Sequence, residues 1–99
     1  MNLPDNTGCT PLIYASDRRS VPIVRMLLER GADVNDREPD GWTALMRAAE
    51  SGDTDTARVL LDKGADVNRK NDEGATALKW AVKEGHREFV RLLKKAGAR

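Results

Sequence analysis

The chain of 99 residues has little of what most catalytic or metal-binding sites need. It contains a single cysteine, Cys9, and a single histidine, His86. One cysteine excludes an internal disulfide and a zinc site built from several cysteines, and it fits a reducing intracellular compartment. One histidine leaves no second imidazole to complete a set of metal ligands. We therefore expect no metal, no cofactor and no catalytic site, and we expect that the protein is not an enzyme.

The sequence also lacks an excess of charge and any long apolar run. Its formal net charge is +1 although 33% of the residues are charged, so the whole molecule has no general attraction for nucleic acid or an anionic membrane. Residues 1–6 show no basic region followed by an apolar run, and no stretch approaches membrane-spanning length. We expect no nucleic-acid or membrane binding, and a cytoplasmic protein, with the nucleus not excluded.

What the sequence does have is an internal repeat with a spacing of 33 residues. The spacing predicts a single domain over 1–99, with repeats at about 5–37, 38–70 and 71–99. Because the glycines recur with the repeat and fall at turns and helix ends, they do not form a phosphate-binding loop. The equivalent positions include Gly8, Gly41 and Gly74; Thr10, Thr43 and Thr76; Leu12, Leu45 and Leu78; Ala15, Ala48 and Ala81; Leu27, Leu60 and Leu93; and Gly31, Gly64 and Gly97.

Each repeat begins with the pattern of a short helix. Thr10, Thr43 and Thr76 each precede apolar residues at helical spacing, and a threonine there can accept hydrogen bonds from the free N–H groups of a helix start. A leucine and an alanine three residues apart then form a narrow apolar stripe. We expect the alanines of this stripe to let neighbouring first helices approach closely.

A second helix is predicted to begin after Ser20, Asp53 and His86 and to stop before a glycine suited to the left-handed conformation. Asp53 and Asp55 are interpreted as exposed acids at such a helix start. Residues 35–41 and 68–74 are polar connectors that end in glycine and predict projecting turns. The larger core residues are expected on the second helices: Val24, Leu27, Leu28, Ala57, Leu60, Leu61, Val90 and Leu93.

These units resemble the ankyrin repeat family. Residues 5–12 read Asp-Asn-Thr-Gly-Cys-Thr-Pro-Leu and residues 27–35 read Leu-Leu-Glu-Arg-Gly-Ala-Asp-Val-Asn, with a near copy at 60–68. The resemblance covers essentially the whole chain. It implies an all-α ankyrin-repeat solenoid of stacked helix-turn-helix units with projecting β-turn or hairpin connectors. It also implies a concave surface of turn tips and first-helix faces that grips protein partners.

The sequence departs from the family pattern at both ends. Ile13, Met46 and Lys79 stand where the family has a histidine that supports a polar network. Lys94 replaces the leucine of the two earlier repeats, which predicts a cap at the C-terminal end. The first repeat is rather apolar, with Val21 and Ile23 beside Ile13, so either upstream repeats are missing or this face pairs with something.

Two sets of connector residues are candidate contacts. Trp42 follows Gly41 in the turn region and could either anchor a partner or pack over its own turn. Asp40, Asp72 and Glu73 belong to a mildly acidic turn edge, which would steer a cationic partner or simply be solvated. Both pairs of interpretations stay open.

The first helices supply the remaining candidates. Tyr14, Arg47 and Trp80 are equivalent positions; we expect Tyr14 and Trp80 to pack between repeats and Arg47 to contact a partner. The first helices end in charged or polar residues that the resemblance assigns to the contact surface, and these could equally be only solvated: Asp17, Arg18, Glu50, Ser51 and Lys83.

His86 follows Gly85 in a Gly-His pair that opens a second helix in the family, which favours a structural cap over catalysis. Cys9 and His86 belong to different repeats and are expected to lie beyond proton-transfer distance.

The hypothesis we favour is a protein–protein interaction module that acts as a monomer, with the partner's identity left open. The alternative is a structural or engineered scaffold, or a fragment of a longer array, that self-associates as a homodimer through the first repeat. Nucleic-acid binding through Arg18, Arg19, Arg25 and Arg30 is disfavoured because the domain lacks overall positive charge.

Overall fold

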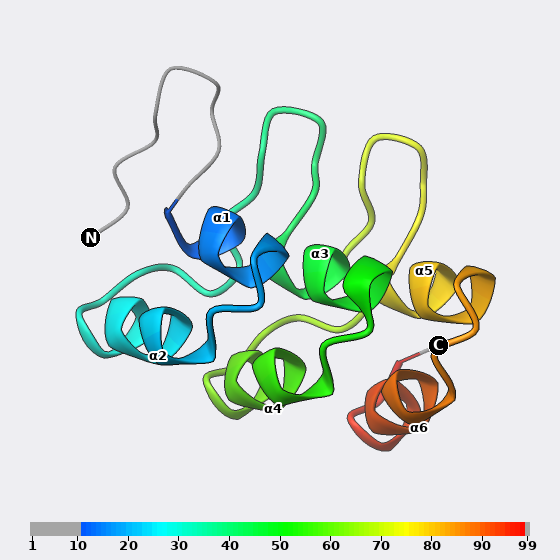
Figure 1. Ribbon diagram of the computed structural model, residues 1–99. Helices are drawn as coiled ribbons and strands as arrows, with labels where there is room; N and C mark the ends of the chain where they lie inside the picture. The colour runs from blue at the N-terminus through cyan, green and yellow to red at the C-terminus, as the bar shows by residue number, and fades with distance from the viewer. Residues whose placement is uncertain (1–10, 99) are drawn as a thin grey trace.

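A computed structural model describes residues 11–98, which form six helices (Figure 1). Consecutive helices pair along the chain, and α1, α3 and α5 form one row while α2, α4 and α6 form the other. The expected all-α solenoid of stacked helix pairs is confirmed. The helices are α1 (Pro11–Asp17), α2 (Val21–Glu29), α3 (Ala44–Ser51), α4 (Thr54–Asp62), α5 (Ala77–Lys83) and α6 (Arg87–Lys95).

The first helices of the second and third pairs start as the sequence predicts. The backbone N–H of Met46 donates to Thr43 Oγ1 at 3.3 Å, and that of Lys79 donates to Thr76 Oγ1 at 3.2 Å. Both threonines have extended backbone, as helix-capping residues do. Thr10, the predicted cap of α1, lies outside the described residues.

The second helices begin directly after Ser20, Asp53 and His86, as predicted, but only Asp53 caps its helix with its side chain among these described residues. The N–H of Thr56 donates to Asp53 Oδ1 at 3.3 Å, and the Thr56 hydroxyl donates to Asp53 Oδ2. The expectation that Asp53 is exposed is wrong, because the side chain is buried with its oxygens satisfied by these donors. Asp55 is exposed as expected.

Each second helix ends in the same glycine-containing motif. After α2, the N–H of Ala32 donates to Leu27 O at 3.0 Å and the N–H of Gly31 donates to Leu28 O at 3.1 Å. The same pair of bonds recurs at Gly64 and Gly97, and all three glycines have positive φ, between 92° and 102°. The predicted left-handed helix ends are therefore confirmed, and they satisfy carbonyl groups that a helix end leaves free.

The core lies between the two rows of helices. Ala44, Ala48 and Ala49 of α3 are fully buried, which allows α3 to pack against both α1 and α5. Leu60 and Leu93 are buried from the second row, as expected, while Leu27, Leu28, Leu61 and Val90 are only partly buried. The sequence interpretation missed Phe89, which has the largest fully buried side chain among the described residues.

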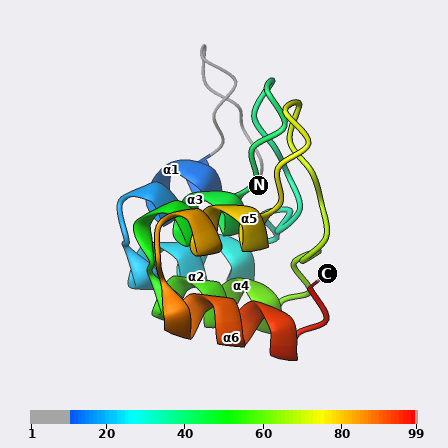
Figure 2. The same ribbon diagram turned by 90° about the vertical axis from the view of Figure 1, so that its right-hand side faces the viewer.

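The connectors project from the row of first helices as predicted, and together with the helices they form the two arms of an L (Figure 2). In the connector before α3, the N–H of Glu38 donates to Trp42 O at 2.9 Å, and the N–H of Gly41 donates to Glu38 O at 2.8 Å. The N–H of Asp72 donates across to Asp40 O at 2.9 Å, so neighbouring connectors are joined.

Gly41 is required by this close approach of the connectors. Its φ is +88°, and a Cβ at this position would lie 2.9 Å from Asn71 Cα. Both the backbone conformation and the neighbouring backbone therefore select glycine.

Asparagine side chains that follow the second helices also join successive pairs. Asn35 accepts a hydrogen bond from the N–H of Asp66 at 2.7 Å and donates to Gly64 O at 3.4 Å. One repeat later, Asn68 donates to Gly97 O at 3.3 Å. Each of these bonds connects one pair to the following pair. They therefore help to set the distance between successive second helices.

Arg19 is the one non-glycine residue with positive φ among residues 11–98, at 61°. Gly52 and Gly85 occupy the equivalent positions with φ of 76° and 74°. A side chain in this left-handed conformation costs roughly 1–2 kcal/mol because Cβ approaches the following carbonyl oxygen. The end of α1 is therefore strained relative to the ends of α3 and α5.

We predict that Arg19→Gly raises the free energy of unfolding by about 1 kcal/mol, after allowing for the greater freedom of glycine in the unfolded chain. Gly85→Arg is the matched reverse change, since nothing lies within 4 Å of an added Cβ there. It should lower the free energy of unfolding by a similar amount in urea denaturation. Effects of the same sign for the two variants would contradict this explanation.

Candidate functional site

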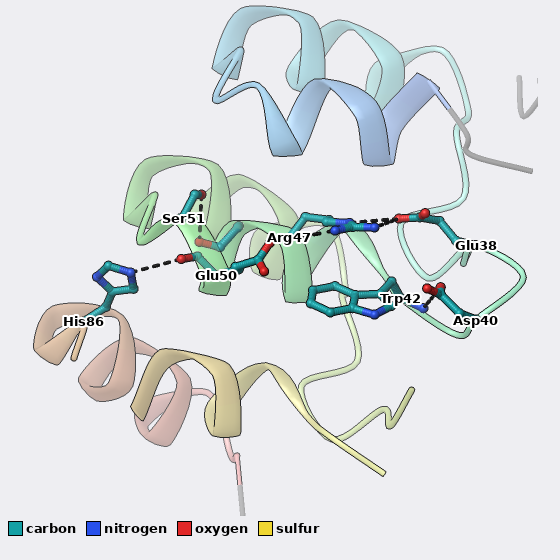
Figure 3. Close-up of polar contacts among 8 residues, drawn as sticks. Glu38, Asp40, Trp42, Arg47, Glu50, Ser51 and His86 are labelled. Atoms are coloured by element: carbon teal, nitrogen blue, oxygen red, sulfur yellow. Dashed lines mark hydrogen bonds and ion pairs between the residues drawn. The ribbon is translucent and has the colours of Figure 1, made fainter. Parts of the chain in front are cut away.

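Two tryptophans from successive pairs stack on each other. The ring centroids of Trp42 and Trp80 are 4.8 Å apart, with 35° between the ring planes. The Arg47 guanidinium lies 4.3 Å from the Trp42 centroid, on the side of the ring away from α5 (Figure 3). Trp42 is only 8% exposed as a result. This burial favours packing over the role of an exposed anchor. Trp42 packs against the next pair as well as against its own turn.

The stack continues to Lys83, whose Nζ lies 5.0 Å from the Trp80 centroid. The side chains thus form one row in which each contacts the next, and we call this row the aromatic stack. Its members, in order, are Arg47, Trp42, Trp80 and Lys83. Contacts between a cation and an aromatic face contribute about 0.5–1 kcal/mol at exposed sites. The expected packing of Trp80 between repeats is observed, and its ring contacts both Trp42 of the preceding pair and the Lys83 ammonium of its own helix.

Arg47 is held by two carboxylates. Its Nε donates to Glu38 Oε1 at 2.9 Å, its Nη2 lies 2.8 Å from the same oxygen, and its Nη1 lies 3.8 Å from Glu50 Oε1. The Arg47 and Glu38 side chains are 25% and 15% exposed, so the pair is partly shielded from water. Arg47 therefore fixes the connector to α3, and Glu38 and Glu50 offset its charge.

His86 connects the end of α3 to the third pair. Its Nε2 lies 3.1 Å from the carbonyl oxygen of Glu50, which can only accept, so Nε2 carries the hydrogen (Figure 3). A Cβ on Gly52 would lie 2.6 Å from the imidazole ring. The expectation of a cap is wrong for the side chain, which makes no capping bond to α6 in the described structure. Instead it positions the α3 end, where the Ser51 hydroxyl donates to Ala48 O at 3.2 Å.

Tyr14 is exposed rather than packed between pairs. Its exposed fraction is 53%, and the Arg18 guanidinium lies 4.7 Å from the ring centroid. The expectation of packing between repeats is therefore wrong for Tyr14. Trp80 packs because Trp42 of the preceding pair lies beside it, whereas the described residues include no pair before α1. Asp17 and Arg18 are exposed beside Tyr14.

A groove of about 300 Å³ lies beside Trp80. Lys79 and Lys83 contribute two basic residues to its lining, and Glu73 contributes an acidic one. The sequence interpretation did not include Lys79 among the site residues. Lys79 could have been recognised because it is equivalent to the buried Ile13 and Met46. A lysine at this position is exposed and adds a positive charge to the surface. The groove is lined by Glu73, Ala75, Lys79, Trp80 and Lys83.

The acidic residues of the connectors differ in their roles: one takes part in a turn, and the others are exposed. Asp40 Oδ1 accepts a hydrogen bond from the N–H of Trp42 at 3.3 Å, so this carboxylate helps to form the turn. Asp72 and Glu73 are exposed, and Asp72 lines a second groove with residues of the preceding connector. The acidic turn edge is thus assembled from two connectors.

The described part of the chain contains neither a metal-binding cluster nor a membrane-spanning helix. Among residues 11–98, no group of three or more histidine, cysteine, aspartate or glutamate side chains could hold a metal ion. Within the same range, no helix has both the length and the apolar character needed to cross a membrane. Cys9 lies outside the described residues, so its separation from His86 is not tested.

We predict that Arg47→Lys lowers the free energy of unfolding by about 1 kcal/mol in urea denaturation. Lysine keeps the charge but loses the flat guanidinium that covers Trp42 and bonds Glu38 through two nitrogens. Arg58→Lys is the control, since Arg58 is 63% exposed and makes one long ion pair on its own helix. Equal losses for the two variants would contradict a special role for Arg47.

Two comparisons with protein families agree with this architecture. The family model described as ankyrin repeats (3 copies) matches residues 35–99, and that described as ankyrin repeats (many copies) matches residues 1–48. Proteins of this family generally serve as protein–protein interaction modules. On the match of the first model to more than half of its residues, together with the stacked helix pairs, the chain belongs to the ankyrin repeat family.

Proposed function

We propose that the protein binds another protein through the inner side of the L, where the first helices meet the connectors. The observation that carries this proposal is the aromatic stack, which joins two pairs and orders the Arg47 and Lys83 side chains against its rings. A surface ordered before binding loses less conformational entropy when a partner docks.

The proposed contact residues are those whose side chains remain accessible on this surface. Aromatic and basic side chains contribute strongly to binding when a partner buries them. Trp42, Arg47, Glu50 and Ser51 form the support beneath or beside them, because their side chains are partly or fully used within the protein. The contact set is Tyr14, Asp17, Arg18, Asp40, Asp72, Glu73, Trp80 and Lys83, to which we add Lys79.

The charges on this surface imply an orientation for the partner. Glu38 and Glu50 offset Arg47, so the accessible cations that the first helices bring to the second and third pairs on this surface are Lys79 and Lys83 of α5. The connector tips carry Asp72 and Asp40 instead. A partner with an acidic segment over α5 and basic groups over the connectors would complement both regions.

We further propose that the protein acts without a cofactor and as a monomer, inside the cell in the cytoplasm or nucleus. The single cysteine supports the compartment, because proteins of oxidising compartments commonly use disulfides. The even charge balance supports a protein partner over nucleic acid.

A second candidate is a scaffold or fragment of a longer array that associates through the first pair. Ile23 is 47% exposed and Met26 is 40% exposed, whereas the equivalent Thr56 and Val59 are buried. This difference favours the packing of a further helical element against α2. Sedimentation at increasing concentration tests self-association, and a dimer lost in Ile23→Glu would support this candidate.

The proposed binding surface is tested by quantitative affinity capture from cell lysate. The variant Lys79→Glu with Lys83→Glu reverses two exposed charges beside Trp80 and leaves the buried part of the stack unchanged. We expect it to reduce recovery of a specific partner about tenfold or more. The acidic groups of the partner that pair with the two lysines would be repelled by the glutamates.

The matched control is Arg58→Glu with Lys63→Glu, which makes the same charge change on exposed residues of the opposite row. This control should retain the partner. Equal recovery by the wild type and both variants, at unchanged far-ultraviolet circular dichroism, would refute the proposed surface.

A further inference from the structure

The outer side of the third pair, viewed in Figure 2, carries a second surface that the inner side of the L does not include. Val82 of α5 is 60% exposed there, the highest value among the exposed large hydrophobic residues described. Val90 of α6 is partly buried beside it. These valines lie in a groove of about 440 Å³ lined by Ala81, Val82, Gly85, Arg87, Val90 and Arg91.

Equivalent residues in the first two pairs are covered by the next pair. Ser16 and Ala49 occupy the position of Val82 and are both 0% exposed. Ala57 occupies the position of Val90 and is also 0% exposed. The face that holds these residues is therefore the one against which the next pair packs, and we call it the trailing face.

The trailing face also carries an arginine in every pair: Arg25, Arg58 and Arg91 are equivalent. Between α2 and α4, Arg25 lines a groove that contains Asp55, Val59 and Asp62 of α4. The trailing face of the first pair thus meets a helix that presents a valine between two carboxylates. This spacing places all three side chains on one side of the helix.

The trailing face of the third pair has Arg91 in the place of Arg25 and a second arginine, Arg87, in the place of Val21, with no such helix on it among the described residues. Within residues 11–98, neither Arg87 nor Arg91 has a carboxylate within ion-pair distance. Val82 and Val90 provide the apolar strip between α5 and α6. Burying exposed apolar surface contributes roughly 25 cal/mol per Å², so covering this strip is favourable.

We propose that the trailing face of the third pair binds a single helix of another protein that carries an aliphatic side chain between two carboxylates. The apolar side chain would cover Val82 and Val90, and the carboxylates would pair with Arg87 and Arg91. In the groove between α2 and α4, Asp55 and Asp62 likewise lie on the same groove wall as Val59 and face the helix that carries Arg25, without an ion pair to Arg25 among the described residues. It is separate from the surface assigned above to partner binding.

Two other occupants fit this face less well. A second copy of the chain would bring Pro22 in place of Asp55, so it lacks one of the two carboxylates. A further helix pair stacked in the same register would pack its first helix against Val82 of α5. In the observed stack, α5 packs against the smaller Ala49 of α3 at the equivalent position. The two additional methyl groups would hold such a pair away from α5, because packed interiors have little free space.

The test uses two hydrocarbon-stapled helical peptides of the same length and with the same central valine. One carries aspartates with the spacing of Asp55 and Asp62, and the other carries lysines at those positions. Titrated into the full ¹⁵N-labelled chain at low salt, the aspartate peptide should bind about tenfold or more tightly than the lysine peptide. It should shift the backbone signals of Val82, Gly85 and Arg91.

Reversing the charges in the variant Arg87→Glu with Arg91→Glu should reverse the peptide preference, whereas Arg58→Glu with Lys63→Glu should preserve it. Equal affinity for the two peptides, or signal changes confined to other residues, would overturn the proposal. Self-association abolished by Val82→Ser would also overturn it, because the occupant would then be a second copy. The variant Lys79→Glu with Lys83→Glu should bind the aspartate peptide about as well as the wild type, which separates this site from the inner surface.

Discussion

The close approach of successive first helices is the constraint on which the rest of the structure depends. Small side chains permit it: Ser16, Ala44, Ala48 and Ala49 are all buried between pairs. Because α3 packs against both α1 and α5, the connectors above them also lie side by side, with Gly41 against Asn71. Among residues 11–98 the main helix contacts lie within pairs or between neighbouring pairs, so the stability of the array resides largely in these interfaces.

The inner surface is a consequence of that stacking. Trp42 belongs to one pair and Trp80 to the next, so their contact exists only when the two pairs are folded against each other. Arg47 then covers Trp42 and is itself held by Glu38, while His86 fixes the end of α3 from the third pair. The surface proposed for partner binding is therefore assembled by the fold and is not a property of any one repeat.

Local features of the fold were predictable from the sequence because their causes are local. The 33-residue spacing gave the repeat, Thr43 and Thr76 marked helix starts, and Gly31, Gly64 and Gly97 marked helix ends, each through bonds to residues only a few positions away. The left-handed Arg19 could have been inferred from its equivalence to Gly52 and Gly85.

Features that depend on a neighbouring pair could not be predicted in the same way. The contact of His86 with Glu50 spans 36 positions in the chain, and no pattern within one repeat indicates it. The burial of Trp42 likewise depends on Trp80 of the next pair, whereas Tyr14 at the equivalent position to Trp80 is exposed. The proposed binding roles of the site residues stay predictions, since the fold supports their grouping on one surface without identifying a partner.

The most direct test of the central claim compares one position in two pairs. Ala49 and Val82 are equivalent, but Ala49 is buried between α3 and α5 whereas Val82 lies on the outer face. Free energies of unfolding in urea should fall by about 1–3 kcal/mol for Ala49→Val, because overpacking separates the first helices. Val82→Ala should change the value by less than about 0.5 kcal/mol. An unchanged stability for Ala49→Val, or an equal loss for Val82→Ala, would contradict the claim that small side chains between the first helices set the architecture.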